Sequence, residues 1–596
     1  MRDATTYLAI FLVGILLLSP VIHSIADLDY ISFLGYLDPN RTWNTVYDLA
    51  GNRFEGRRAG TQGAELASEY VASYFNSIGL QPAGMNGTYR TRFTLPLWQL
   101  VEMPSLSLVE SSRNVSRVFE YRRDFFVMPG SGSGDYSAEV VFGGYGITAE
   151  SLGYDDYSGI SAHGKIVLAI VGTPASDRFS QGDYGQTYEK AENALRHGAV
   201  GLILASSALH YVEEQSCGYC WTISNGLTVL GGSVEMADAL MKDTGFTLTS
   251  LDRSISQAVR PHSIALGKEL HVSVHASFTP NATAYNVLGF IPGSDAASAK
   301  VVIVGAHYDH WGKDVNGDIF RGAEDNGSGV AVMMEIARVF SAGVKPRSSI
   351  LFAAWSGEEE GHYGSHAYVD HPYFSLARTI AYLNLDMVGA GNPLIFQSSE
   401  AHIALRAVTT DSAEQLGITI RIQGYEAISD HAVFEGQGVP NLLFYYWPYA
   451  EYHTPSDTAD HISRANLLET ERLTALIALK LSDATVTPAY ATTVVSSSAV
   501  SESRSKSETV QGKQSVPSAM PLPIFLTAIL LGTGVIVTLI VSVLVLRKRV
   551  HVEAPEASRT GSSSVEARLV CKACGCVNPE FVRSYCVRCG AKLDAD

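Results

Sequence analysis

Five residues of types that commonly bind metal ions occur in one half of this 596-residue chain, each shortly after an apolar segment or before a predicted helix. They are His307, Asp325, Glu359, Asp386 and His453. Imidazole nitrogens and carboxylate oxygens suit zinc or another divalent ion, and five such groups can hold two ions that share one carboxylate. Each residue taken alone could have a simpler role; for example, Asp325 could cap the helix expected from about Ser328. Their joint placement predicts a two-metal site.

The elements that must position these residues alternate between strands and helices from about residue 284 to residue 481. The apolar segments are Tyr285–Ile291, Val301–Gly305, Ser349–Ala354, Thr379–Leu385 and Asn441–Tyr446, and the helical patterns are Gly329–Ser341, Glu400–Leu416 and Ala465–Leu481. The segments are apolar throughout rather than alternating, as expected for strands buried on both faces. We therefore predict an α/β fold with a mainly parallel mixed sheet and flanking helices. Ligands in such folds bind beyond the carboxyl ends of the strands, where the five residues lie.

A two-metal site of this kind predicts hydrolysis. Two divalent ions about 3.5 to 4 Å apart lower the pKa of a shared water, and one ion polarises the carbonyl group that is attacked. A carboxylate beside the water must accept its proton and return the proton to the leaving amine. Glu358 and Glu359 are both candidates, because adjacent residues can point to opposite sides and their spacing does not distinguish them.

Five sequence segments resemble the motifs of metallopeptidase family 28, and they follow one another in the order found in that family. They are GAHYDHWG, GAEDNGSG, FAAWSGEEEGHYGS, NLDMVG and YHTPSDT. The resemblance covers roughly Thr42 to Leu481 and implies the phosphorylase/hydrolase-like fold of zinc exopeptidases. It also implies a division of the five ligands. His307 and Asp386 would hold one zinc ion, Glu359 and His453 the other, and Asp325 would bridge both.

The resemblance assigns three further roles. Glu358 matches the general base, and Tyr452 matches a residue whose hydroxyl stabilises the oxyanion in some members. Asp309 matches a carboxylate that orients the first histidine ligand, which fixes the tautomer and basicity of that imidazole. Two positions depart from the family pattern without removing a ligand. His362 stands where a hydrophobic residue is common, and Glu324 stands where aspartate is more frequent.

The pocket for the substrate side chain is less well defined by the sequence. Trp311 and the aromatic segment 445–449 could line an apolar pocket, or they could pack in the core.

Upstream, FEGRRAGT at residues 54–61 resembles the N-terminal segment of the family. Residues 137–261, with VVFGGYG, GKIVLAIVG and VGLILAS, resemble the protease-associated (PA) domain, a β-rich insert that steers substrates. The peptidase domain would then comprise residues 27–136 and 262–485.

Charge and composition limit the possible partners. The chain has 43 Lys and Arg against 60 Asp and Glu, a net charge of −17, and no long basic segment, so nucleic acid is not an expected partner. Apolar residues make up 46% of the chain and charged residues 17%, which predicts a folded body. At this length we expect two or three folded units. Cys217 and Cys220 lie in the part predicted to be exported, where a disulfide is the expected state.

Both ends of the chain carry segments that predict export and membrane anchoring. Residues 1–26 resemble a signal peptide, with an uncleaved anchor helix as the alternative. After a Ser/Thr-rich linker at 486–519, a membrane helix is predicted at 522–546, and the basic residues 547–549 that follow favour the cytoplasm. We therefore expect a single-pass protein of the cell membrane with its peptidase and PA domains outside.

The C-terminal tail predicts a second kind of metal site. After a cytoplasmic linker at 547–568, residues 569–596 contain two CxxC pairs that can deliver four thiolates to one structural zinc ion. The cysteines are Cys571, Cys574, Cys586 and Cys589. Disulfides are the alternative, but a reducing cytoplasm favours metal. This zinc ribbon would serve docking or stability, with a cytoplasmic partner that the sequence does not identify.

The function predicted from these features is that of a membrane-anchored zinc aminopeptidase acting on peptides. A glutamate-type carboxypeptidase and a glutaminyl cyclase are alternatives within the same family. A carboxypeptidase would need a cationic cluster for the free carboxylate, and none is evident in the sequence. A non-catalytic receptor with a peptidase fold is a third possibility, which the complete set of ligands and the general base disfavour.

Overall fold

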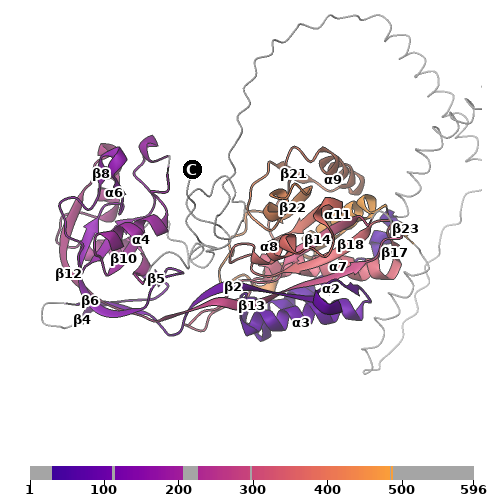
Figure 1. The fold of residues 1–596 in the computed structure, drawn as a ribbon, viewed down its shortest axis with the longest axis horizontal. Coiled ribbons are helices and arrows are strands. Elements are labelled where there is room, and N and C mark those ends of the chain that lie inside the picture. The colour runs from indigo at the N-terminus through magenta and orange to yellow at the C-terminus, as the bar shows by residue number, and fades with distance from the viewer. Residues whose placement is uncertain are drawn as a thin grey trace, which may run out of the picture. The chain divides into compact units, whose positions relative to one another are not determined.

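The computed structural model describes residues 30–109, 115–180, 182–205, 226–295, 299–483 and 485–486, which form two sheets with their helices (Figure 1). The larger sheet has nine strands and carries the predicted site. Its order is β1 (Gln81–Pro82), β13 (Ala276–Ile291), β18 (Ser349–Trp355), β14 (Val301–His307), β19 (Thr379–Leu385), β22 (Asn441–Tyr446), β20 (Leu394–Gln397) and β21 (Ile420–Gln423), and β2 (Arg90–Leu100) pairs with β13.

The centre of this sheet is parallel and its margins are partly antiparallel. Strands β18, β14, β19 and β22 run parallel to one another, while β13 and β20 pair with them antiparallel. Every residue of β14 and β18 is buried, which confirms the expectation of strands covered on both faces. The mixed α/β fold predicted from the sequence is thus present.

Helices cover both faces of the nine-stranded sheet because successive strand residues point to opposite sides. Val302 and Val304 of β14 join a core with α2 (Pro39–Leu49), α3 (Gln62–Ser77), α7 (Gly329–Gly343) and α11 (Arg464–Leu481). Val301 and Ile303 join a second core with α8 (Tyr363–Asp370) and α10 (His431–Glu435). Helix α9 (Ile403–Leu416) packs on the first core, so the three predicted helices correspond to α7, α9 and α11.

The smaller sheet has eight strands and is formed by residues 105–274. Its order is β4 (Val115–Phe119), β3 (Ser105–Val109), β12 (Ser263–Val274), β6 (Gly134–Gly143), β9 (Ile166–Ile170), β10 (Gly201–Ala205), β11 (Thr228–Gly232) and β5 (Phe125–Val127). Helices α4 (Thr187–Arg196), α5 (Val234–Leu240) and α6 (Leu248–Ala258) pack against it. The sheet extends beyond the predicted insert at 137–261 on both sides, because β3, β4 and β5 precede residue 137 and β12, which pairs with β6 and β3, follows residue 261.

Several predicted segments lie outside the described residues. These are the signal segment at 1–26, the cysteines Cys217 and Cys220, and everything after residue 486, which includes the linker, the 522–546 helix and the zinc ribbon. Within the part of the chain that the structure describes, no helix has both the length and the apolar character needed to cross a membrane.

Candidate active site

The predicted metal ligands converge at the carboxyl ends of the central parallel strands. His307 is the last residue of β14, and Asp386 directly follows β19. Glu359 lies in the turn after β18, and His453 lies in the loop after β22. Asp325 comes from a π-helical turn, η8 (Ala323–Ser328), which leads into α7.

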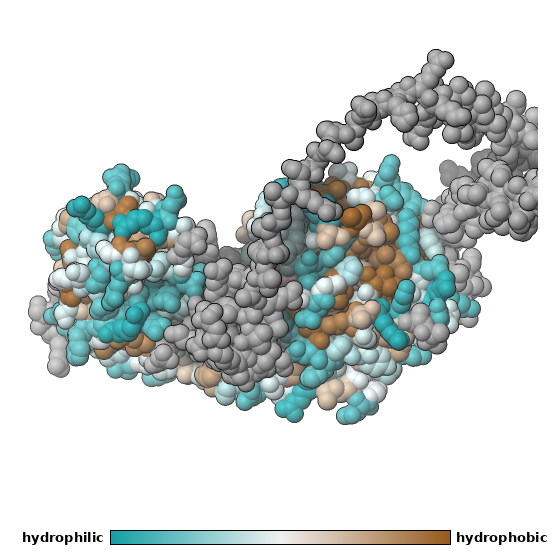
Figure 2. All heavy atoms as spheres, turned by 45° about the horizontal axis from the view of Figure 1, so that its top comes forward, coloured by the Kyte–Doolittle hydropathy of each residue, from teal (hydrophilic) through white to brown (hydrophobic). Residues whose placement is uncertain are grey.

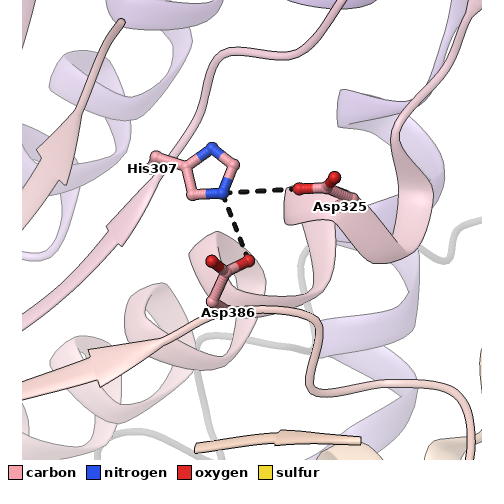
Figure 3. A group of neighbouring side chains, drawn as sticks. All are labelled: His307, Asp325 and Asp386. Carbon is pink, nitrogen blue, oxygen red and sulfur yellow. Dashed lines mark hydrogen bonds and ion pairs between the residues drawn. The ribbon is translucent and has the colours of Figure 1, made fainter. Parts of the chain in front are cut away.

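His307 contacts two of these carboxylates with one ring nitrogen. Its Nε2 atom lies 3.4 Å from Asp325 Oδ1 and 3.2 Å from Asp386 Oδ1 (Figure 3). The three side chains come from three different elements and point toward a common centre in Figure 3. Such a convergence of one imidazole and two carboxylates suits a divalent cation such as zinc.

The second oxygen of Asp325 faces the other predicted ligands. Asp325 Oδ2 lies 2.9 Å from His453 Nε2, and Glu359 Oε2 lies 3.4 Å from the same nitrogen. Asp325 therefore stands between two groups, with one oxygen toward His307 and the other toward His453. This is the geometry needed of a carboxylate that is shared by two ions.

The two adjacent glutamates point in different directions. Glu358 approaches His307, with 3.9 Å from Oε2 to Nε2, and His362, with 3.2 Å from Oε1 to Nε2. Burial raises the pKa of Glu358 well above its ordinary value. Burial would also raise the pKa of Glu359, but the imidazoles of His453 and His310 hold it well below the ordinary value. Neighbouring carboxyl groups with pKa values displaced in opposite directions are typical of acid–base sites.

A cleft of about 400 Å³ opens beside the proposed metal ligands. Its acidic end is formed by Asp325, Glu358, Glu359 and Asp386 together with His453, and its other walls are formed by Met387, Ile395, Arg421, Gln423, Glu426, Ile428, Leu443, Tyr445, Trp447 and Tyr452. Figure 2 shows apolar side chains gathered among polar ones on the surface of the part that carries the nine-stranded sheet. Ile428 and Trp447 are 51% and 40% exposed, so apolar surface of the cleft is accessible to a substrate.

The predicted aromatic segment divides between cleft and core. Tyr445 and Trp447 line the cleft, whereas Tyr446 and Tyr449 are buried in the core. Trp311 is also buried, with its ring 4.2 Å from that of His453 and 5.5 Å from that of Phe320.

The chemistry of these side chains fits zinc. Nitrogen and oxygen atoms of three overlapping groups lie within 4.8 Å of one another, namely His307 with Asp325 and Asp386, His307 with Glu358 and Glu359, and His310 with Asp325 and Glu359. Most of these side chains are buried, and bound cations would offset the desolvation and mutual repulsion of their carboxylates. Imidazole and carboxylate are ligand types that zinc accepts.

Comparison with known proteins agrees with this site. The sequence model of peptidase family M28 matches residues 286–478, which contain all five predicted ligands. Aminopeptidase YwaD of Bacillus subtilis is 30% identical over 368 residues, which cover 58% of this chain and 68% of YwaD. The chain belongs to peptidase family M28. It is accordingly a metallopeptidase, a hydrolase acting on peptide bonds, as predicted from the sequence.

Other relatives of this M28 peptidase match over shorter segments. Leupeptin-inactivating enzyme 1 of Streptomyces exfoliatus is 34% identical over 162 residues, covering 27% of this chain and 35% of that protein. A vacuolar membrane protease of Candida dubliniensis is 31% identical over 189 residues, covering 30% of this chain and 19% of that protein. The chain thus spans well under half of the length of these two relatives.

Solved structures share the fold of this M28 peptidase. The aminopeptidase from Aneurinibacillus sp. strain AM-1 superposes with a TM-score of 0.56 at 22% identity, over 75% of this chain and 95% of that one. BSAP, a zinc aminopeptidase from Bacillus subtilis, superposes with a TM-score of 0.54 at 23% identity, over 74% of this chain and 95% of that one.

Asp309 connects the ends of two neighbouring strands of the M28 peptidase. Its carboxylate accepts hydrogen bonds from the backbone N–H groups of Glu358 and Glu359, both at 3.3 Å. The same carboxylate lies 3.8 Å from His307 Nδ1, and that nitrogen is 3.3 Å from the backbone carbonyl of Asp309. The nearer partner of His307 Nδ1 is thus the carbonyl, while the carboxylate holds the glutamate turn.

Asp457 and Glu324 hold the loops around Asp325. The Asp457 carboxylate accepts from the backbone N–H groups of Glu324 at 2.8 Å and Asp325 at 3.1 Å, so it joins the His453 loop to the Asp325 turn. The Glu324 carboxylate accepts from Gly389 N at 2.8 Å and so joins that turn to the loop after Asp386. The departure at Glu324 therefore has a structural role, which the sequence did not indicate.

Arg57 is a second residue whose contribution the sequence did not indicate. It belongs to the FEGRRAGT segment and is fully buried. Its guanidinium donates to the backbone carbonyls of Leu49, Tyr308, Arg321 and Gly322 at 2.6 to 2.7 Å. Burial lowers the pKa of Arg57 to about 10, so it remains charged at neutral pH beneath the carboxylates of the site. Its partners are backbone carbonyls of distant segments, which leave no pattern in the sequence, so the burial of Arg57 could not be predicted from the FEGRRAGT segment.

Tyr452 lies at the edge of the cleft, stacked on a predicted ligand. Its ring centroid is 3.6 Å from that of His453, and its side chain lines the cleft. Burial, and then the carboxylates of Asp325 and Glu359, raise the pKa of Tyr452 above its ordinary value. The hydroxyl therefore stays protonated at neutral pH and can act as a hydrogen-bond donor.

Proposed function

We propose that this M28 peptidase is an aminopeptidase that removes N-terminal residues from peptides with the help of two zinc ions. The observation that carries the proposal is the position of Asp325, with one oxygen toward His307 and the other toward His453. His307 and Asp386 would hold one ion, Glu359 and His453 the other, and Asp325 both. Zinc bound there would supply Lewis acidity and a water of lowered pKa.

The residues of the chain would carry the proton and hold the substrate. Glu358 would accept a proton at its carboxylate from the attacking water and return it to the nitrogen of the leaving amine. Tyr452 would donate its hydroxyl proton in a hydrogen bond to the carbonyl oxygen as negative charge develops there. The apolar wall of the cleft would receive the side chain of the first substrate residue and exclude water from it.

The charge of the cleft favours the amino end of a peptide over the carboxyl end. Arg421 is its one arginine, and Glu426 lies in the same wall, against four carboxylates at the acidic end. A second cavity of the described residues contains Arg58 and Arg122, but both are paired, with Glu360 and Asp314 respectively, each at 2.8 Å. A free α-ammonium group is compatible with the acidic end, whereas a substrate carboxylate would meet repulsion there. The related protein YwaD is also named an aminopeptidase.

The remaining proposals concern the parts around the peptidase. We infer from the sequence that the chain is exported and anchored by the 522–546 helix, with the zinc ribbon in the cytoplasm. The eight-stranded body formed by residues 105–274 would be a PA domain that steers substrates. The related vacuolar membrane protease bears a name that refers to a membrane, which is compatible with the anchor.

The experiment that tests the function is end-specific cleavage of three matched peptides by the full chain. One peptide has both ends free, one has an acetylated N-terminus, and one has an amidated C-terminus. We expect mass spectrometry to show shortening from the N-terminus of the free and amidated peptides and no change in the acetylated one. A chelator should abolish the cleavage and added zinc should restore it.

Each alternative function gives a different pattern when a fourth peptide, with N-terminal glutamine, is added to the set. Cleavage of the acetylated but not the amidated peptide would indicate a carboxypeptidase. Loss of ammonia from a peptide with N-terminal glutamine, without shortening, would indicate a cyclase. A zinc-loaded chain that changes none of these peptides would contradict the enzymatic proposal and favour a receptor.

A further inference from the structure

His310 and Trp311 are buried beside the proposed site but have no part in the mechanism above. They follow His307 and Asp309 in the motif HYDHW. His310 Nδ1 lies 2.7 Å from Glu359 Oε1, and Trp311 Nε1 donates to Glu359 Oε2 at 3.0 Å. Two consecutive residues thus contact both oxygens of a single carboxylate, which is the proposed ligand from the neighbouring strand.

The contacts fix which nitrogen of His310 carries a proton. A carboxylate oxygen at 2.7 Å from Nδ1 requires a donor, so Nδ1 bears the hydrogen. His310 Nε2 is buried and has no hydrogen-bond partner among the described residues, so a hydrogen on that atom would be left unsatisfied. The Nδ1–H group of His310 therefore donates to Glu359.

The backbone around His310 holds the ring in this position. A Cβ atom on Gly322 would lie 2.5 Å from His310 Cγ and 2.6 Å from Cδ2, so the ring packs directly against that glycine. Gly322 has a positive φ of 54°, and its carbonyl accepts from Arg57 at 2.7 Å. A glycine is required there both for the conformation and for the close approach of the imidazole.

His310 has an alternative role as a metal ligand, since it forms a possible metal-binding group with Asp325 and Glu359. The distances disfavour that role. His310 Nδ1 is 3.8 Å from Asp325 Oδ2, whereas His453 Nε2 is 2.9 Å from the same oxygen. His453 therefore occupies the position beside the shared carboxylate, and His310 lies behind Glu359.

We propose that His310 and Trp311 are positioning residues that orient the Glu359 carboxylate for the metal ion it shares with His453. The inference rests on the proposed function. Each oxygen of Glu359 would accept one N–H hydrogen bond, from His310 or from Trp311, and keep a second lone pair for the ion. These two hydrogen bonds would prevent the carboxylate from rotating. The ion at His307 and Asp386 has no such dependence, so changes at 310 or 311 should weaken one zinc ion and spare the other.

Zinc affinity of the full chain, measured without substrate by competition with a chromophoric chelator, tests this inference. Trp311→Phe keeps the ring and removes only the N–H donor. We expect its peptidase site to bind two zinc ions at saturation, besides the ion expected on the tail cysteines, with one of the two about 10- to 100-fold weaker than in the wild type. Trp98→Phe is the matched control, because Trp98 Nε1 donates to the carbonyl of Ser131 at 2.9 Å, in a region outside the site.

Substitutions of His310 separate positioning from ligation. The side-chain amide of His310→Asn places a donor near the position of the original Nδ1, so it should retain most of the affinity that His310→Ala loses. Melting curves of the zinc-loaded variants verify that each is folded. If the peptidase site of both His310 variants binds a single zinc ion even at saturation, His310 is a ligand and the positioning role is wrong.

The result for Trp311→Phe distinguishes failure of this inference from failure of the proposed function. Two zinc ions in the peptidase site of the wild type, with unchanged affinities in Trp311→Phe, would contradict the positioning role alone. A wild-type chain that binds no more than one zinc ion in the peptidase part would contradict the two-metal function and, with it, this inference.

Discussion

At the scale of single residues, the structure gives different chemical properties to two adjacent glutamates. Glu358 faces His307 and His362, while Glu359 faces His310 and His453. Both glutamates lie in a turn that follows Gly357, whose φ of 76° is a conformation that glycine adopts without strain. One short turn after β18 thus supplies both a group able to accept a proton and a group that stays ionised to bind a cation.

Replacing Glu358 with Gln tests this division of roles. Because the amide cannot accept the proton from water, we expect kcat to fall by about 10²- to 10⁴-fold. Zinc content, measured by atomic absorption, should equal that of the wild type because Glu358 would not be a ligand. The control is Glu360→Gln, in which a carboxylate paired with Arg58 at 2.8 Å is removed while the proposed machinery stays intact. Loss of one zinc ion from Glu358→Gln would show that the roles of Glu358 and Glu359 are reversed.

The proposed metal ligands are predictable from the sequence, and the residues that hold the loops are much less so. His307 ends one apolar strand and Asp386 directly follows another, and the strand pattern is visible in the sequence. Arg57 and Asp457 bind backbone atoms of segments far away in the sequence, such as Tyr308 and Asp325. Backbone atoms are the same at every position, so no residue pattern announces such contacts.

At the scale of elements, helices α2, α7 and α11 meet around a buried polar cluster. Glu335 of α7 accepts from the backbone N–H of Asp38 at 2.8 Å and from Arg338 Nε at 2.8 Å. Glu471 of α11 is fully buried and contacts the hydroxyl of Thr42, which also lies 3.2 Å from the carbonyl of Asp38. The hydroxyl has one proton to donate, so a protonated Glu471 that donates to it satisfies both contacts.

The pH dependence of stability follows from this cluster. Burial raises the pKa of Glu471 from an ordinary 4.5 to about 8, so between these values the folded state holds a proton that the unfolded state has released. The free energy of unfolding should therefore fall as pH rises through this window. Glu471→Gln is neutral throughout, and we expect its stability relative to the wild type to improve on the order of 3 kcal/mol between pH 5 and pH 8.

Urea unfolding of both proteins at the two pH values measures the difference. Glu469→Gln is the control, because Glu469 lies on the same helix but is only partly buried. Its stability relative to the wild type should change less with pH. An equal effect of Glu471→Gln at pH 5 and pH 8 would mean that Glu471 is ionised in the folded state.

The elements that the sequence predicted best are those buried on both faces. β14, β18, β19 and β22 appear as continuous apolar segments, and the structure confirms them within about two residues. β13 begins at Ala276 rather than at Tyr285, because its first half pairs with β2 and is largely exposed, so its residues are not apolar. The short strands β20 and β21 were not predicted, since four residues are too few to show a pattern, and those of β21 are only partly buried.

At the scale of the whole molecule, the acidic charge of the chain and its proposed metal sites are related. The net charge is −17, and carboxylates that are buried in the site add repulsion within the folded part. Bound cations would offset that repulsion and stabilise the fold in proportion to their concentration relative to Kd. The cysteines of the tail offer a separate set of ligands of a different chemical type.

The two kinds of site predict the zinc content of the full chain. Two ions in the peptidase site and one on Cys571, Cys574, Cys586 and Cys589 give three zinc ions per chain. Replacing Cys586 and Cys589 with Ser removes half of the thiolates, and fewer than thirty residues cannot form a stable core without the metal. We expect this variant, purified in detergent and analysed by atomic absorption, to hold two zinc ions and to keep the peptidase activity of the wild type, because the ligands of the peptidase site are unchanged. Three ions in the variant would place the third outside the tail, and two ions in the wild type would mean that the cysteines bind no zinc.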